Sequence, residues 1–156
     1  MKKADRIIIS ELRKNSSKNI VDVANSTGIP LSTLYDRLNA VQKKYVKRNS
    51  SLVDFRKLGY PFASFTTIKV DETSRKEVAD HLNGCKNINS IYKLNFGSKY
   101  MIETVFRNLT EYEQFLQKLK ALNAEIIMVN HINEEITKER FLTEQSHFES
   151  DEDEPN

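Results

Sequence analysis

The chain has 156 residues, of which 38% are hydrophobic and 29% are charged, and it carries a net charge of +2. This composition is typical of a folded, water-soluble chain, and its longest apolar runs are far shorter than the roughly 20 residues that a membrane helix needs. The N-terminus leads into no signal-peptide core, and Cys85 is the only cysteine, which excludes an intrachain disulfide and a cysteine-based zinc site. We therefore expect a cytoplasmic protein with no membrane partner.

The charge is divided unevenly between two parts of the chain. Residues 1–60 carry 13 Lys and Arg against 5 Asp and Glu, a net charge of +8, whereas residues 61–156 carry 11 against 17, a net charge of −6. A basic region next to an acidic one indicates that the first meets a polyanion such as nucleic acid. Charge alone leaves an alternative to nucleic-acid binding open, namely that scattered lysines only keep the fold soluble.

The first 48 residues are predicted to form three short helices. In the first helix, Ile8 and Leu12 lie one turn apart on the same face. Asn19 is a suitable N-cap for the second helix. Gly28 follows that helix in a tight turn where the chain needs a positive φ, a conformation that glycine adopts at little cost.

The third helix begins at Pro30, whose missing N–H costs little in the first turn of a helix. One face carries an apolar stripe at steps of three and four residues, formed by Leu31, Leu34, Leu38, Val41 and Tyr45. The other faces carry Ser32, Thr33, Tyr35, Asp36, Arg37 and Asn39, and the basic residues Lys43, Lys44, Lys47 and Arg48 follow. This order is the pattern of a helix-turn-helix unit: two helices, a glycine turn and a third helix with a polar exposed side. An ordinary three-helix bundle with a solvated face is the alternative.

After a linker over residues 49–61, the periodicity changes from helical to strand-like. Strands are predicted over residues 62–70, 88–96, 99–106 and 125–133. Two helices lie between them, each with a capping box at its start, formed by Ser74 with Glu77 and by Thr110 with Glu113. The order βαββαβ predicts a ferredoxin-like α+β sandwich over residues 62–139, with both helices on one face of an antiparallel sheet.

The face of this sheet away from the helices should be polar in a monomer. The predicted strands are instead apolar at consecutive positions, as in residues 126–129, so that both faces of the sheet are apolar. Because helices cover only one face, a second copy of the sheet is the simplest cover, and we expect a homodimer or a higher homo-oligomer. The alternative is that the polar residues Thr66, Lys93 and Glu103 make one face polar enough to stand alone.

Residues 140–156 are expected to be a disordered acidic tail. Residues 140–147 are of mixed composition, but five of the six residues 149–154 are acids. Such a tail can compete with DNA for the basic part of the chain, but a solubilising role is the simpler interpretation.

Four segments, in this order, resemble the Lrp/AsnC transcription regulators, also called feast/famine regulatory proteins. The opening helix of that family is similar to residues 5–12 (DRIIISEL), and its recognition segment is similar to residues 28–38 (GIPLSTLYDRL). Its linker strand and turn are similar to residues 53–60 (VDFRKLGY). The hairpin of its effector-sensing domain is similar to Gly97 with the strand that follows. The resemblance implies a (winged) helix-turn-helix domain over residues 1–48 that binds double-stranded DNA, and a RAM-type effector-sensing and oligomerisation domain over residues 62–139. It also implies a transcription regulator that needs no cofactor and is not an enzyme.

The resemblance places the DNA contacts on the third predicted helix. We expect the two recognition helices of a dimer to enter successive major grooves, so that palindrome-like half-sites lie about 34–36 Å apart or a multiple of that distance. Arg37 is the first candidate for a base contact, since Arg pairs bidentately with guanine. Bases or phosphates are expected to meet Ser32, Thr33, Tyr35, Asp36 and Asn39, and phosphates alone Lys43, Lys44, Lys47 and Arg48.

The resemblance also implies an effector pocket between neighbouring sensing domains, close to Asn95, Gly97, Ser98, Lys99 and Tyr100. In the family this hairpin usually reads Gly-x-aromatic-Asp, whereas here it reads Gly-Ser-Lys-Tyr from Gly97 on, without the acid. Lys99 repels an α-amino group and favours a carboxylate. An amino-acid-like effector, another ligand, and a plain β-turn without a ligand therefore all stay open. Pro30 is a second departure, since the family usually has Ser there.

Two other classes of function compete with this interpretation. Siroheme decarboxylases resemble the family in fold, and such an enzyme needs His and Arg in a haem-sized cavity. The histidines His81, His131 and His147 show neither metal spacing nor a nucleophile partner. The other class is a protein-interaction module whose helix-turn-helix binds a protein instead of DNA. The net charge of +8 over residues 1–60 argues against both.

Overall fold

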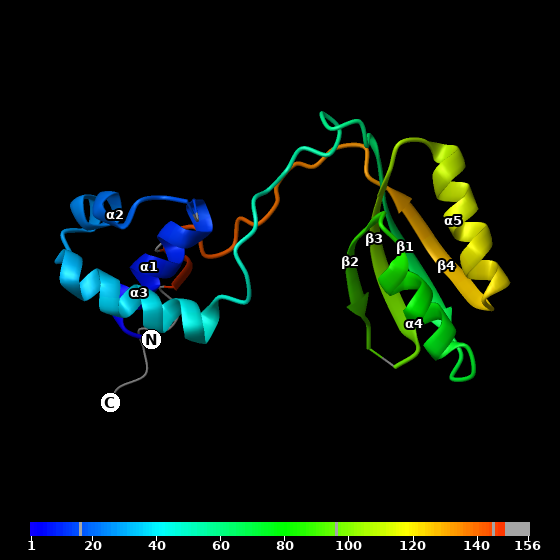
Figure 1. Ribbon diagram of the computed structural model, residues 1–156, viewed down its shortest axis with the longest axis horizontal. Helices are drawn as coiled ribbons and strands as arrows, with labels where there is room; N and C mark the ends of the chain where they lie inside the picture. Colours follow the sequence, from blue (N-terminus) through cyan, green and yellow to red (C-terminus); the bar gives the residue numbers. More distant parts are fainter. Residues whose placement is uncertain (16, 96, 145, 149–156) are drawn as a thin grey trace. The chain divides into compact units, whose positions relative to one another are not determined.

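The structure is a computed structural model that describes residues 1–15, 17–95, 97–144 and 146–148. Its elements are α1 (Lys3–Lys14), α2 (Ile20–Thr27), α3 (Leu31–Tyr45), β1 (Phe62–Val70), α4 (Arg75–Gly84), β2 (Ile88–Lys93), β3 (Lys99–Phe106), α5 (Leu109–Ala121) and β4 (Ala124–His131) (Figure 1). This order of three helices and then βαββαβ confirms the predicted α+β fold class. The chain divides into a three-helix unit, which contains residues 1–52 and the segment from Ile136 on, and a sheet unit over residues 53–135.

The three-helix unit packs around a small apolar core. Ile8 of α1, Val23 of α2, and Leu34 and Val41 of α3 are the buried members of this core. Leu34 and Val41 lie two turns apart on α3, as the apolar stripe predicts, and neither is more than 1% exposed. The stripe therefore fixes which side of α3 faces inward.

The turn between α2 and α3 is built as the sequence predicts. The side chain of Asn19 accepts a hydrogen bond from the N–H of Val21 at 3.0 Å and so caps α2. Gly28 ends α2 with φ 69°, and its N–H donates to the carbonyl of Ala24 at 2.9 Å. A side chain at this positive φ would be strained, so glycine allows the chain to reverse directly into α3.

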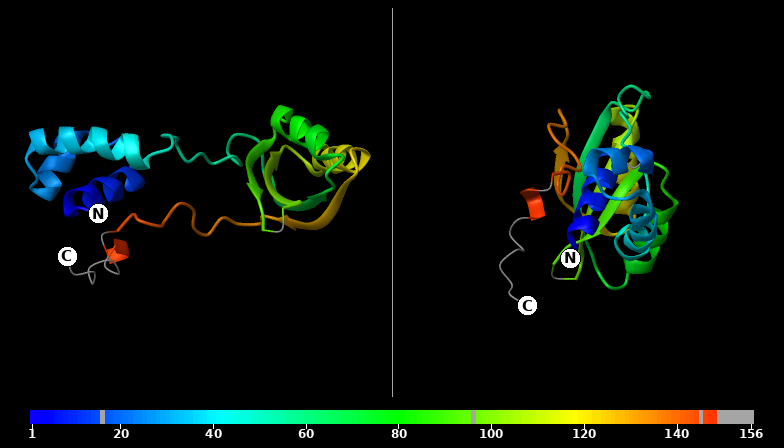
Figure 2. Two further views of the ribbon diagram at one scale, coloured as in Figure 1. Left: turned by 90° about the horizontal axis from the view of Figure 1, so that it is seen from below. Right: turned by 90° about the vertical axis from the view of Figure 1, so that its left-hand side faces the viewer.

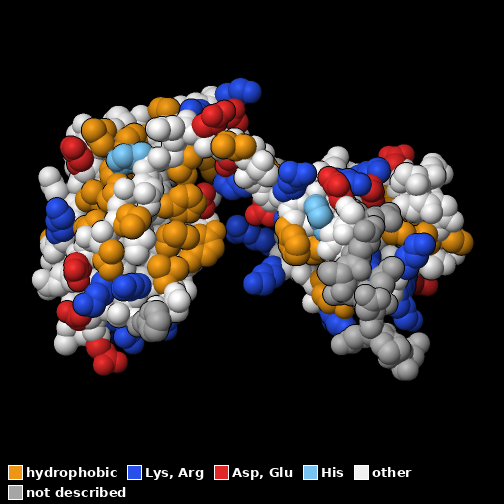
Figure 3. Space-filling model, turned by 180° about the vertical axis from the view of Figure 1, so that it is seen from behind, with side chains coloured by type: hydrophobic (Ala, Val, Ile, Leu, Met, Phe, Trp, Pro, Cys, Tyr) orange, Lys and Arg blue, Asp and Glu red, His pale blue; other side chains and the backbone are white. Residues whose placement is uncertain are grey.

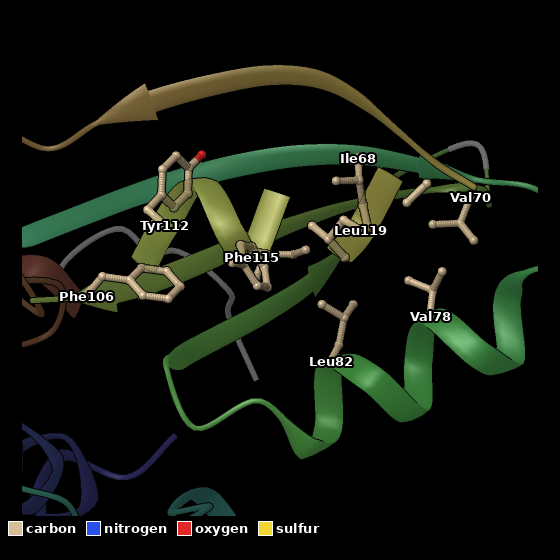
Figure 4. Packing of buried hydrophobic residues seen from close by; sticks show 10 residues of the cluster. Ile68, Val70, Val78, Leu82, Phe106, Tyr112, Phe115 and Leu119 are labelled. Atoms are coloured by element: carbon tan, nitrogen blue, oxygen red, sulfur yellow. The ribbon is translucent and has the colours of Figure 1, made fainter. Parts of the chain in front are cut away.

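The sheet unit is a four-stranded antiparallel sheet in the order β2-β3-β1-β4. Helices α4 and α5 cover one face of the sheet, and the other face carries no helix (Figure 2). The core between helices and sheet includes Ile102 together with Ile68, Phe115 and Leu119, and Figure 4 shows how the last three pack. This is the predicted ferredoxin-like arrangement.

Polar side chains in this core are paired with one another. Thr66 of β1 is hydrogen-bonded to the hydroxyl of Tyr112 on α5 at 2.8 Å. Ser64 is hydrogen-bonded to Thr104 on β3 at 2.9 Å. Buried hydroxyls without partners would be costly, so these pairs allow polar residues to face the helices. Thr66 therefore does not lie on the open face, where the sequence analysis considered it.

Both predicted capping boxes differ from the observed helix starts. Helix α5 begins after Asn108, whose side chain accepts the N–H of Glu111 at 2.9 Å. The Glu111 carboxylate in turn accepts the N–H of Arg107 at 3.3 Å, so the box lies two residues before the predicted one. Ser74 precedes α4 in a helical conformation and its side chain makes no cap hydrogen bond.

The linker contains a turn but no strand. Among the described residues between α3 and β1, no strand is assigned, so the linker strand and the wing that the resemblance implies are absent there. The turn is closed by the N–H of Tyr60, which donates to the carbonyl of Phe55 at 2.9 Å. Arg56 then donates to the carbonyl of Ile132 at 3.0 Å and to that of Asn133, which attaches the turn to the end of β4.

The segment after β4 lies against α1. The composition predicts a disordered tail from residue 140, yet residues 140–144 and 146–148 belong to the three-helix unit and are hydrogen-bonded to α1. The side chain of Phe148 is only 5% exposed, and burial of this ring favours the contact. The acidic residues 149–154 lie outside the described residues.

Candidate nucleic-acid interface

Helix α3 presents a polar surface to solvent. Because its apolar stripe packs against α1 and α2, the opposite side must face outward. The exposed side chains there are Ser32, Thr33, Tyr35, Asp36 and Asn39, all predicted DNA contacts. Tyr35 is 51% exposed although it is aromatic. Hydroxyl, amide and carboxylate groups on one exposed helix are suited to hydrogen bonds with base edges or phosphates.

Four cations continue this surface. Lys43 and Lys44 lie in the last turn of α3, and Lys47 and Arg48 follow it; all four are exposed. No carboxylate among the described residues forms an ion pair with any of them. Cations at a helix C-terminus are stabilised by the helix dipole, and these four stay available for a polyanion. We call the exposed side of α3 together with these four residues the α3 face.

Arg37, predicted to contact a base, forms an ion pair within the three-helix unit. Its Nε lies 3.0 Å from a carboxylate oxygen of Asp5 on α1, and the two side chains are 26% and 16% exposed. Arg37 lies on the border of the apolar stripe, where a long side chain can turn inward as well as outward. In this structure it joins α3 to α1, and it would have to leave Asp5 in order to reach a base.

A second charged cluster neutralises the other end of α1. Glu11 is bound by Lys18 at 2.5 Å and by Lys14 at 3.3 Å. The hydrogen bond from Lys18 is the largest of the effects that hold the pKa of the Glu11 carboxyl below its usual value. These two lysines are therefore engaged within the unit, unlike the four cations of the α3 face.

The predicted effector hairpin is closed by backbone hydrogen bonds. Gly97 has φ 74°, the N–H of Leu94 donates to the carbonyl of Lys99 at 2.9 Å, and the N–H of Val70 donates to the carbonyl of Ser98 at 2.8 Å. Asn95 and Gly97 are exposed, whereas Ser98 and Lys99 are half-buried. Phe96 lies outside the described residues.

The structure places Lys69 next to the predicted effector residues, and it places the ring of Tyr100 on the opposite side, toward the core. Lys69 of β1 is the register partner of Lys99, so two ammonium groups lie on adjacent strands. Lys69 also lies 3.7 Å from Glu125 of β4. Tyr100 packs against the helix-covered core. Only the strand register reveals Lys69, because 30 residues separate the two lysines in the sequence.

The open face of the sheet is largely apolar. Figure 3 shows hydrophobic side chains gathered over this side of the sheet unit. Met128 is 54% exposed and Tyr92 46%. The charged residue Glu103, predicted to be a polar part of this face, is only 7% exposed and accepts a hydrogen bond from Ser90 at 2.7 Å. The polar groups thus cover little of this face.

The histidines are packing residues. His131 lies 4.8 Å from the ring of Phe62, and His81 lies 6.4 Å from that of Phe115. Within the described ranges there is no group of three or more His, Cys, Asp or Glu residues that could hold a metal ion. No helix in the same part of the chain is long and apolar enough to span a membrane.

These features define a class of protein: a helix-turn-helix unit joined to an antiparallel βαββαβ sandwich. Comparison with known proteins shows what the chain is similar to. Residues 63–130 match the Lrp/AsnC ligand binding domain. The HTH-type transcriptional regulator FL11 of Pyrococcus abyssi is 26% identical over 119 residues, which cover 76% of this chain and 79% of that protein. The transcriptional regulator AzlB of Bacillus subtilis is 22% identical, covering 72% and 74%.

Solved structures show the same fold. The chain superimposes on Bacillus subtilis LrpC with a TM-score of 0.80 at 21% identity, covering 88% of this chain and 97% of that one. A Neisseria meningitidis regulator, NMB0573, solved as its L-Met complex, gives a TM-score of 0.79 at 15% identity, covering 88% and 93%. Residues 63–130 thus match the ligand binding domain of the Lrp/AsnC family, and most of the chain is similar to HTH-type transcriptional regulators. Its curated relatives are transcription regulators, not enzymes.

Proposed function

We propose that this protein regulates transcription in the cytoplasm by binding double-stranded DNA with the α3 face, as a homodimer or a higher oligomer. The observation that carries the proposal is the α3 face itself: an exposed polar helix, fixed by its buried stripe, that ends in four cations without ion-pair partners among the described residues. An exposed helix of this kind fits the major groove, and the cations after it fit the phosphates.

Base reading is assigned to the part of the α3 face that is free in the structure. Asn39 is the strongest candidate, since Asn pairs bidentately with adenine. Ser32 and Tyr35 lie on the same exposed side, with Thr33 and Asp36. Arg37 can contact a guanine base only if its ion pair with Asp5 breaks. Lys43, Lys44, Lys47 and Arg48 supply affinity without sequence preference.

The dimer is proposed on the open face of the sheet unit. Apolar side chains on this face are too exposed for a monomer, as Met128 shows. A two-fold pairing of the same face buries them and holds two α3 faces for palindrome-like half-sites, about 34–36 Å apart or a multiple of that distance.

An effector is proposed at the hairpin of residues 94–99. The L-Met complex of NMB0573 shows that a structural neighbour is bound to an amino acid. In this chain, Lys69 and Lys99 on adjacent strands favour a ligand with a carboxylate. Asn95, Gly97 and Ser98 complete the proposed site, whereas the ring of Tyr100 packs toward the core.

The test is selection of bound fragments from a genomic library, followed by titration of a selected fragment and its scrambled version. Asn39→Ala is expected to weaken binding to the selected fragment by about 1–3 kcal/mol and to leave the scrambled one unchanged. Lys47→Ala is expected to weaken both equally and to flatten the dependence of log K on log salt. Failure to enrich any fragment over bulk DNA would reject sequence-specific binding.

A further inference from the structure

The three-helix unit contains a groove of about 1000 Å³, which is within the size range of small-molecule sites. It is lined by α1, by the end of α3 with the chain as far as Leu52, and by Glu139, Phe141 and Leu142. All of these stretches belong to the same unit. The Arg13 guanidinium donates to the carbonyls of Glu139 at 2.8 Å and Phe141 at 3.0 Å. These hydrogen bonds hold the last stretch of the lining against α1.

Much of the groove lining is apolar, and it includes two exposed aromatic rings. Ile9 and Leu12 of α1 line the groove together with Leu142, and all three are half-buried. Tyr45 and Phe141 also line it, and they are 46% and 70% exposed. Exposed rings of this kind are platforms on which a planar ring can stack. The lining therefore suits a ligand with an aromatic body.

The groove also offers two cations that are free to bind an anion. Lys47 and Arg48 line it, are exposed, and form no ion pair with a carboxylate in the described part of the chain. Arg13 and Lys14 line it as well, but both are paired with carboxylates, Arg13 with that of Glu139. Two unpaired cations match the charge of a phosphate monoester, about −1.5 to −2 at neutral pH, better than the single charge of a carboxylate.

We propose that this groove binds a free mononucleotide, with its base against the ring of Phe141 and its phosphate held by Lys47 and Arg48. His147 stacks on Phe141 with ring centroids 6.2 Å apart, and the exposure of Phe141 leaves its other side open to a base. Base–aromatic stacking accepts any base, and both cations form charge-assisted hydrogen bonds with phosphate. A base inside a DNA duplex is stacked and is not available for such a contact. A second copy of the groove would bring like charges together.

The site has a consequence for DNA binding, which rests on the proposed function. Lys47 and Arg48 belong to the α3 face, so a bound nucleotide occupies two of the cations that are proposed to meet DNA phosphates. The two ligands then compete, and each lowers the affinity for the other by the same factor. The groove is separate from the hairpin of residues 94–99, because it is formed within the three-helix unit.

Nucleotide binding is tested without DNA by equilibrium dialysis of the full chain against labelled adenosine monophosphate (AMP). Phe141→Ala should weaken AMP binding at least about fivefold, since it removes the stacking ring but keeps the backbone carbonyl that Arg13 binds. Lys47→Gln should weaken it to a similar extent. Lys43→Gln is the matched control, because Lys43 lies on α3 but does not line the groove. An absence of saturable binding, or equal losses in the two lysine variants, would overturn the proposal.

Fragments of the nucleotide test which groups the groove recognises. Adenosine lacks the phosphate and ribose phosphate lacks the base, so each should bind at least about tenfold more weakly than AMP. Ribose phosphate that binds as tightly as AMP would overturn the nucleotide assignment and make the groove a contact for the DNA backbone.

The competition is tested by titrating scrambled DNA with and without a saturating concentration of AMP. AMP should lower the affinity of the wild-type chain for DNA several-fold, and the same concentration should have little effect on Phe141→Ala. An unchanged affinity of the wild type would overturn the competition. AMP binding by a chain that binds no DNA would reject the proposed function and leave the nucleotide site established.

Discussion

The three-helix unit has four buried residues in its core cluster, whereas the sheet unit has ten among the described residues. The smaller unit also depends on a segment from beyond the sheet, since residues 139–143 are hydrogen-bonded to Ser10 and Arg13 of α1. The larger unit pairs even its buried hydroxyls internally, as Thr66 and Tyr112 show. We therefore expect the surface proposed for DNA to lie on the less stable unit, and the surface proposed for assembly on the more stable one.

The largest effect is expected from Leu34→Ala, which opens a cavity in the small core. Leu34 is fully buried, and such a substitution costs about 2–5 kcal/mol. We expect the three-helix unit to unfold at a lower temperature while the sheet unit and its dimer persist, as seen by circular dichroism and sedimentation. Leu119→Ala is the matched change in the sheet unit. A single transition that shifts equally in both variants would show that the two units unfold together.

The next effect is expected from Met101→Asp on the open face of the sheet. Met101 lies on β3 between its register partners Tyr92 of β2 and Thr67 of β1. A carboxylate buried between two sheets without a partner costs several kcal/mol, so the dimer should dissociate at least tenfold more readily in sedimentation equilibrium. Glu113→Lys on the helix-covered side is the control. An unchanged dissociation constant would place the dimer contact elsewhere.

A smaller effect separates packing from base reading on α3. Arg37→Ala removes the partly exposed pair with Asp5 and should lower the free energy of unfolding by up to about 1 kcal/mol. Asn39→Ala should leave the free energy of unfolding within about 0.5 kcal/mol of the wild type, because its side chain is exposed. Urea unfolding measures both. If Arg37→Ala leaves stability unchanged and removes base preference instead, the original assignment of Arg37 to a base is correct.

The smallest effect is a pH dependence confined to the three-helix unit. The folded state lowers the pKa of the Glu11 carboxyl, so its contribution to stability is present above the ordinary value of 4.5 and is lost as the pH falls through the lowered one. Glu11→Gln should therefore destabilise the unit near pH 7 and matter less near pH 3. Urea titrations at both pH values compare the variants. An equal difference at both would assign the effect to packing of the side chain.

Local patterns in the sequence predicted most of the fold. The apolar stripe of α3, the Asn19 cap and the Gly28 turn depend on residues a few positions apart. The structure has the cap and the turn as predicted and buries Leu34 and Val41 of the stripe, whereas Leu31 and Tyr45 at its two ends are 39% and 46% exposed. Element ends were less predictable. Asn108 competes with Thr110 for the start of α5, and the sequence alone did not show which side chain would cap the helix.

Long-range pairings were the part that the sequence did not predict. Asp5 pairs with Arg37, and Arg13 with Glu139, across 126 residues of chain. Lys69 joins the proposed effector site only through strand register. Charged residues of this kind have many alternative partners in solution, and only the packed backbone selects one. The predicted DNA contacts followed from helical periodicity, but the orientation of one flexible side chain, Arg37, did not.

The sheet unit is an insertion between two parts of the three-helix unit, residues 1–52 and the segment from Ile136 on. The backbone passes between the units twice, once before β1 and once after β4. Two covalent crossings restrict the relative motion of the units more than one linker would. A protease that cuts only the first crossing would leave α1 to α3 attached to the rest of the molecule through the hydrogen bonds of Arg13 to Glu139 and Phe141 and the buried ring of Phe148. A nicked molecule would therefore still migrate as one particle until denatured.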